Sequence, residues 1–144
     1  MKKMITKFSK MKPTRFFVIG AITLCALQFA FTPAKAQDWT APATASKVEN
    51  PVPSNDKSVA EGKTIYTNNC KSCHGVKGKG DGPKSADLEK TPQDFSKEKF
   101  QLQTDGALFW KITEGKKPMP TFKKDLTPEQ RWQVINYLRK LGKK

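Results

Sequence analysis

Histidine and cysteine are scarce in this chain of 144 residues, which holds one histidine and three cysteines. A structural zinc site usually takes four Cys or His ligands. Outside the stretch 70–74 only Cys25 is left and there is no other histidine, so a zinc site of that kind is disfavoured. Strand patterns are also lacking, because no segment shows a convincing alternation of apolar and polar residues. We therefore predict an all-α fold.

The other two cysteines and the histidine stand together as Cys70-Lys71-Ser72-Cys73-His74. This pentapeptide is typical of covalent c-type haem attachment. Thiols at positions i and i+3 lie on one side of a helical turn, so both can reach the two vinyl groups of one porphyrin. The histidine is then placed to ligate the iron. A reactive dithiol is the alternative, whereas a thioredoxin-like motif would need a βαβ pattern that is missing.

Residues 1–36 have the pattern of a secretory signal peptide. Six basic residues precede the uncharged apolar run 16–31, and an A-x-A cleavage site at 34–36 would leave Gln37 first. Covalent haem attachment suits a compartment outside the cytoplasm, so we predict an exported, periplasmic protein. A retained membrane anchor is the alternative, although a run of 16 residues is shorter than the roughly 18 of a spanning helix. A lipidated Cys25 is disfavoured by the large residue before it.

The mature chain divides into an arm and one small domain. Residues 37–57 are rich in proline and alanine and are interpreted as an extended arm or linker. Three prolines in this stretch, at 42, 51 and 53, prevent a continuous helix. Residues 58–144 are predicted to form the domain.

Capping signals and glycines set the expected helices of this domain. The first helix is predicted to begin at Ser58, which forms a capping box with Glu61. Gly62 indicates that another helix crosses close by, because glycine inside a helix costs about 1 kcal/mol against alanine. A compact middle helix is expected from Asp105 to Glu114, ended by Gly115.

The last helix has the clearest pattern. Thr127 caps it, Pro128 takes the first helical position and Gln130 completes a capping box. Its apolar stripe consists of Trp132, Ile135, Leu138 and Leu141. Between the helices, residues 75–83 contain four glycines and a proline and predict a loop that can lie flat against a porphyrin edge. Residues 84–103 are expected to form a longer loop, whose predicted core residues are Phe95, Phe100 and Leu102.

Met119 is the only methionine of the mature chain, and it lies between Pro118 and Pro120. Proline on both sides restricts the backbone to extended or turn conformations, so the thioether is held on a stiff loop. With His74 as the single histidine, ligation by two histidines of this chain is excluded. We predict Met119 as the second iron ligand; simple packing in the core is the alternative.

Over residues 58–142 the chain resembles class I c-type cytochromes, the small monohaem family. The residues that carry the resemblance are Gly62-Lys63, Tyr66, Cys70 to Gly75, Gly78 to Pro83, Gly115, Met119-Pro120, Trp132 and Tyr137-Leu138. The resemblance implies a cytochrome c-like fold, in which the N- and C-terminal helices cross around one covalently attached haem c, near Gly62 and against Tyr137. It further implies that Cys70 and Cys73 hold the haem. A backbone carbonyl near Pro83 is expected to accept the second ring N–H of His74.

Histidine and methionine together saturate the iron, so the expected function is single-electron transfer and not enzymatic catalysis. A thioether ligand stabilises Fe(II) and raises the reduction potential. Two alternatives remain open. One is a fixed electron-transfer subunit of a respiratory or dehydrogenase complex, docked through the arm and associated with a membrane. The other is a haem enzyme or gas sensor with a displaceable sixth ligand.

Charge indicates the kind of partner. The whole chain has a net charge of +14, and without residues 1–36 it keeps 20 basic and 13 acidic residues, a net charge of +7. Electron donor and acceptor proteins with acidic docking surfaces are therefore expected, and nucleic acid is not. The lysines expected to ring the haem edge are Lys71, Lys77, Lys79, Lys84, Lys116, Lys117, Lys123 and Lys124. An ordinary solvated lysine surface is the alternative.

Overall fold

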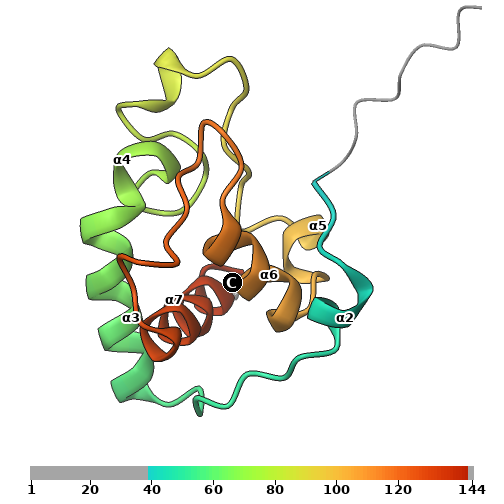
Figure 1. Ribbon diagram of the computed structural model, residues 1–144. Helices are drawn as coiled ribbons and strands as arrows, with labels where there is room; N and C mark the ends of the chain where they lie inside the picture. The colour runs from blue at the N-terminus through green and yellow to red at the C-terminus, as the bar shows by residue number, and fades with distance from the viewer. Residues whose placement is uncertain (1–38, 143–144) are drawn as a thin grey trace, which may run out of the picture. The chain divides into compact units, whose positions relative to one another are not determined.

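The computed structural model describes residues 39–142, which are helical with long connecting loops (Figure 1). The helices are α2 (Ala43–Ser46), α3 (Asp56–Asn69), α4 (Lys71–His74), α5 (Glu98–Gln101), α6 (Asp105–Glu114) and α7 (Pro128–Leu141), with a 3₁₀ turn at Ser85–Asp87. Within residues 39–142 the only β-type pairing is an isolated bridge between Lys116 and Met119. The all-α prediction is confirmed.

The predicted signal segment, 1–36, lies outside the described residues. No helix between residues 39 and 142 is long and apolar enough to cross a membrane.

Helices α3 and α7 cross and form the main helix contact of the domain (Figure 1). Gly62 makes this approach possible, because a Cβ atom at that position would lie 2.0 Å from the carbonyl oxygen of Gln133. The prediction of a close crossing at Gly62 is therefore confirmed. The partner on α7 differs from the one that the resemblance implied: the closest approach is at Gln133 and Val134, and Tyr137 instead packs against the ring of Tyr66 at 5.2 Å.

The caps of the two later helices agree with the sequence. Thr127 accepts from the backbone N–H of Gln130 at 3.2 Å, and the Gln130 side chain accepts from the N–H of Thr127 at 2.8 Å. Helix α6 ends at Gly115, whose φ of 65° is in the left-handed region that glycine adopts without strain. The stripe of α7 is buried at Ile135, with 0% exposure, and at its neighbours along the helix.

The start of α3 corrects the prediction. Asn55, and not Ser58, is the N-cap: its side chain accepts from the backbone N–H of Ser58 at 2.9 Å. Ser58 becomes the third helical residue, and its hydroxyl accepts from the N–H of Asn55. Glu61 is left free to accept from the side-chain amide of Gln133 at 2.6 Å. Asparagine and serine both cap well, so the sequence alone does not decide between two caps three residues apart.

Of the three core residues expected in the longer loop, two are buried and one is exposed. Phe95 and Phe100 are buried, but Leu102 is 76% exposed. Leu102 follows α5 directly, and the side chains of Phe100 and Leu108 occupy the core around it. The prediction for Leu102 was wrong because a single leucine in an irregular loop has no period that fixes its face.

The arm before α3 packs against the domain, and we call residues 39–54 the N-terminal strap. It contains α2, which lies against α6 (Figure 1). Gly106 of α6 allows this contact, because a Cβ atom there would be 2.1 Å from the carbonyl oxygen of Ala45. The side-chain amide of Asn136 donates to the carbonyls of Val52 and Pro53 at 3.1 and 3.3 Å. The segment predicted as an extended linker is thus partly helical and fixed to α6 and α7.

Candidate haem-attachment site

Cys70, Cys73 and His74 occupy a helical turn at the end of α3. Cys70 ends α3 through a hydrogen bond from its N–H to the carbonyl of Tyr66 at 2.8 Å, and it also begins α4. The N–H groups of Cys73 and His74 both donate to the carbonyl of Cys70, at 3.2 and 2.9 Å. Two half-buried, free thiols therefore lie one turn apart, as the spacing predicted.

The thiol of Cys70 is held in its protonated form. Burial, followed by the nearby Cys73, raises the pKa of Cys70 to about 12. A thiol, and not a thiolate, is thus present at neutral pH, because ionisation in this low-dielectric environment is unfavourable. This shift is the opposite of the depressed pKa that activates a thiol as a nucleophile, so Cys70 itself lacks the character of a reactive cysteine.

The glycine-rich loop 75–83 folds back onto the turn that carries the cysteines. The N–H groups of Gly80, Gly82 and Lys84 donate to the carbonyls of residues 74, 73 and 72 at 2.9, 3.2 and 2.9 Å. A Cβ atom at position 82 would lie 2.4 Å from the carbonyl oxygen of Ser72, so the chain there has no room for a side chain. Pro83 stands in this return, exposed, between two of the hydrogen bonds.

Tyr66 fixes the other side of the loop. Its hydroxyl donates to the carbonyl of Gly75 at 2.6 Å, and its side chain is among the most buried in the domain, with 1% exposure. Burial, with smaller contributions from Cys70, Tyr137 and Asp81, raises the pKa of Tyr66 well above its usual range, which keeps the donor protonated. Tyr66 was named only among the residues that carry the family resemblance, and a tyrosine four residues before Cys70 is the only sequence signal for this role.

The imidazole of His74 is half-buried, and its Nδ1 atom is fully covered. Its ring stacks on Phe95 with centroids 4.5 Å apart, and the backbone of Phe95 donates to the carbonyl of Gly78 at 2.7 Å. Burial lowers the pKa of His74, and a contact with the backbone of Gln93 acts in the opposite direction. The stacking by Phe95, expected only as a core residue, was missed because Phe95 lies in a loop without periodicity.

The Nδ1 atom of His74 is buried and has no hydrogen-bond partner in the described part of the chain. The hydrogen bond expected from this ring to a carbonyl near Pro83 is therefore not formed. Buried polar atoms are normally paired, and the contact of the ring with the Gln93 backbone is the nearest candidate for that pairing. A neutral imidazole beside two reduced thiols on one turn is the donor set that covalently bound haem requires, and the residues fit that group.

Met119 lies on a separate loop that follows α6. The N–H and carbonyl groups of Lys116 and Met119 exchange two hydrogen bonds, of 3.0 and 2.8 Å, which close the tight turn that the flanking prolines predicted. The hydroxyl of Thr121 donates to the carbonyl of Thr113 at 2.6 Å, so the loop is tied to the end of α6. The side chain of Met119 is half-buried and packs against the same core cluster as Cys70.

The lysines predicted to surround the site are all exposed, four beside the attachment turn and four beside the methionine loop. Val76 stands among the first group with 71% exposure.

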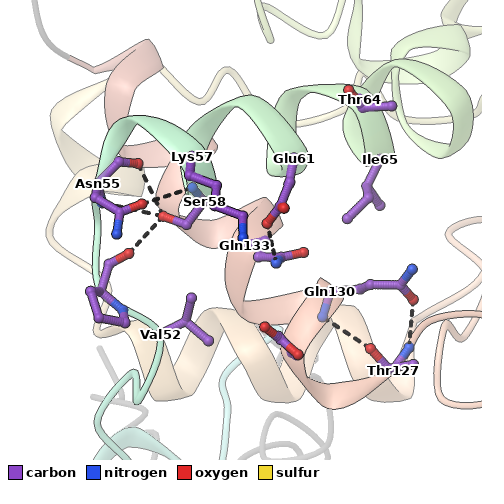
Figure 2. A pocket seen from close by; sticks show the side chains of 12 residues that line it. Val52, Asn55, Lys57, Ser58, Glu61, Thr64, Ile65, Thr127, Gln130 and Gln133 are labelled. Atoms are coloured by element: carbon purple, nitrogen blue, oxygen red, sulfur yellow. Dashed lines mark hydrogen bonds between the residues drawn. The ribbon is translucent and has the colours of Figure 1, made fainter.

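A separate pocket of about 680 Å³ opens between the N-terminal halves of α3 and α7 (Figure 2). Its lining includes Glu61, Thr127 and Gln133 but none of Cys70 to His74, so it is distinct from the attachment site.

Two crossing helices, joined to a Cys-x-x-Cys-His turn and a loop that carries a single methionine, define a monohaem c-type cytochrome. The sequence model of the family described as cytochrome c matches residues 59–142, and the chain belongs to this family. Its cofactor is covalently bound haem c with iron, and its role is electron transfer between redox partners.

Three curated relatives share this assignment. The chain is 35% identical to cytochrome c6 of Nostoc sp. over 82 residues, which cover 57% of this chain and 68% of that protein. It is 26% identical to cytochrome c6 of Gloeothece citriformis, over 84% of this chain and 90% of the relative. It is 30% identical to cytochrome c6 of Parathermosynechococcus lividus, over 56% and 86%.

Two solved structures are similar as well. A chain of the Kuenenia stuttgartiensis reducing HAO-like protein complex Kustc0457/Kustc0458 matches with a TM-score of 0.59 and 32% identity, over 63% of this chain and 46% of that one. This protein thus spans less than half of that chain. The KustC0563 c-type cytochrome matches with a TM-score of 0.50 and 31% identity, over 57% of this chain and 98% of the other.

Proposed function

We propose that this protein is an exported carrier of single electrons whose haem iron is ligated by His74 and Met119. The observation that carries the proposal is the turn that places the thiols of Cys70 and Cys73 beside the imidazole of His74, whose lowered pKa favours the neutral form that ligates iron. Cys70 and Cys73 would hold the haem through thioether bonds. When bound, the haem supplies the Fe(III)/Fe(II) couple, whose potential a methionine ligand raises.

The residues of the chain favour a closed site over an open one. The turn at Lys116–Met119 and the tie from Thr121 to α6 hold the thioether in place, so little rearrangement accompanies a change of redox state. The loop that contains Pro83 is fixed to the attachment turn by three backbone hydrogen bonds. We therefore place the protein among carriers and not among haem enzymes or gas sensors, which need a displaceable sixth ligand.

Absorption spectra of the oxidised and reduced holoprotein test this proposal. The oxidised protein is expected to show the thioether-to-iron charge-transfer band, and the reduced protein should not bind carbon monoxide at neutral pH. Replacing Met119→Ala should abolish the band, lower the reduction potential and allow carbon monoxide to bind. An unchanged potential in this variant would contradict Met119 ligation.

The exposed lysines and Val76 support docking to an acidic redox partner. Lysines around an apolar contact steer oppositely charged partners and give fast encounters that weaken as salt is added. A steep fall of the electron-transfer rate with ionic strength is expected for a free carrier.

The match to a chain of a multi-subunit complex favours a second candidate, a fixed subunit, which would co-purify with its complex in stoichiometric amount. The predicted signal peptide supports a periplasmic location, in a free or a membrane-anchored form.

A further inference from the structure

Arg131 is a buried cation without a carboxylate partner. It lies four residues into α7 with 6% exposure, and its partners are neutral. One terminal nitrogen, Nη1, donates to the hydroxyl of Thr113, and Nε donates to the carbonyl of Thr127 at 3.4 Å. The guanidinium stands over the ring of Phe109, with Cζ 4.7 Å from the centroid. Among residues 39–142 no Asp or Glu oxygen lies within 4.0 Å of it, in contrast to Arg139, which pairs with Asp105 at 2.6 Å.

This position is unfavourable for a positive charge. Burial lowers the pKa of Arg131, and the charge of Glu114, which does not form an ion pair with it, offsets only part of that effect. The first turn of a helix also carries a partial positive charge, which repels a nearby cation. Apolar side chains often replace buried ions without loss of stability, so packing alone does not explain an arginine here.

The two hydrogen-bond acceptors of Arg131 lie at the two ends of the methionine loop. Thr113 is the penultimate residue of α6, and Thr127 is the N-cap of α7. The segment between them carries Met119. The hydroxyl of Thr113 donates to the carbonyl of Phe109 at 2.7 Å, so it is oriented to accept from Arg131. The flat guanidinium donates in two directions at once, a geometry that an ammonium group does not reproduce.

We infer that Arg131 is a positioning residue that clamps both ends of the methionine loop and so keeps the thioether of Met119 on the iron. This inference rests on the proposed ligation by Met119. Arg131 does not touch the ligand atom itself; it acts through Thr113 and Thr127. Loss of the clamp should raise the fraction of molecules in which Met119 has left the iron.

Imidazole added to the oxidised holoprotein tests the clamp, because it binds only where the sixth position is free. The apparent Kd for imidazole falls in proportion as the fraction of molecules with Met119 off the iron rises. The Arg131→Gln variant should bind imidazole about tenfold more tightly than the wild type, the change in equilibrium constant that one hydrogen bond to a charged group supplies. The thioether-to-iron band reports displacement directly.

Arg139→Gln is the matched control. Arg139 also ties α7 to the rest of the domain, through Asp105 and the carbonyls of Gln101 and Gln103, but it contacts no residue of the methionine loop. The Arg139→Gln substitution should lower the free energy of unfolding in urea without tightening imidazole binding. If Arg131→Gln does not fold, Arg131→Lys keeps the charge, loses the two-directional donor and should still tighten binding.

The outcomes separate the two proposals. A wild-type protein without the thioether-to-iron band would overturn Met119 ligation and, with it, the clamp. If the band is present but both Arg131 variants bind imidazole within about twofold of the wild type, the clamp alone is refuted, because a lost charged hydrogen bond changes an equilibrium constant by more than that. Equal tightening in Arg139→Gln would also refute it, since the effect would then follow general destabilisation.

Discussion

The crossing of α3 and α7 makes Gly62→Ala the most informative substitution in the domain. A methyl group at this position would start 2.0 Å from the carbonyl oxygen of Gln133 and 2.6 Å from its carbonyl carbon. An ordinary contact needs at least 3.4 Å, so the two backbones would have to separate by about 1.4 Å. No side-chain rotation relieves this clash, because the atoms that it meets belong to the main chain of α7.

The expected cost follows from two opposing effects. Alanine favours a helix over glycine by about 1 kcal/mol. Overpacking a core usually costs about 1–3 kcal/mol, and the upper end applies where rigid backbone must move. Separation of the helices also loosens Tyr66, Val134 and Ile135, which are the most deeply buried side chains of the domain. We expect a net loss of about 2 kcal/mol in the free energy of unfolding, or about 10 °C in Tm for a domain of this size.

Urea unfolding of the oxidised holoprotein, followed by far-UV circular dichroism, measures this loss. Lys63→Ala is the matched control, because it changes the next residue on the exposed face of α3 and should stay within about 0.5 kcal/mol of the wild type. A Gly62→Ala protein as stable as the Lys63→Ala control would refute the reasoning. It would mean that the helices do not approach at Gly62 as closely as described.

Two further substitutions test the ties around this crossing. Tyr66→Phe removes the hydrogen bond to Gly75 and should cost about 1 kcal/mol in urea unfolding, whereas Tyr137→Phe, whose hydroxyl has no hydrogen bond within residues 39–142, should cost less. Because burial raises the pKa of Tyr66 in the folded protein, its contribution to the free energy of unfolding is complete below the unfolded pKa of about 10 and declines at higher pH. The difference in stability between the wild type and Tyr66→Phe should therefore narrow above that pH. Asn136→Ala should cost about 2 kcal/mol and speed proteolysis of the N-terminal strap; unchanged proteolysis would contradict a fixed strap.

Local signals were sufficient for the later helices. Thr127, Pro128 and Gln130 mark the start of α7 within one turn, and Gly115 marks the end of α6. Each of these residues acts on its own backbone, so its effect can be predicted without knowledge of the fold. The start of α3 was three residues off because Asn55 and Ser58 are both good caps and they share one capping box.

Tertiary contacts explain what the sequence did not predict. The N-terminal strap has no period, and its place depends on Asn136, a polar residue that binds three of its groups from α7. The stacking of Phe95 on His74 likewise joins a residue of an irregular loop to the end of α4. For the candidate site, the attachment turn could be predicted from residue spacing, whereas the unpartnered Nδ1 and the hydroxyl of Tyr66 on Gly75 appear only when the chain is folded.

The contacts between the two ends of the domain determine when it can fold. Glu61 meets Gln133 across 72 residues, Ser58 meets Asn136 across 78, and Asn50 meets the same Asn136 across 86. Pairings of such separation carry a large entropy of loop closure before they stabilise the chain. Helix α3 therefore lacks its main packing partner until α7 has been synthesised. A chain that lacks its final fifteen residues should be unable to bury Tyr66, so folding is completed only once the C-terminal helix is available.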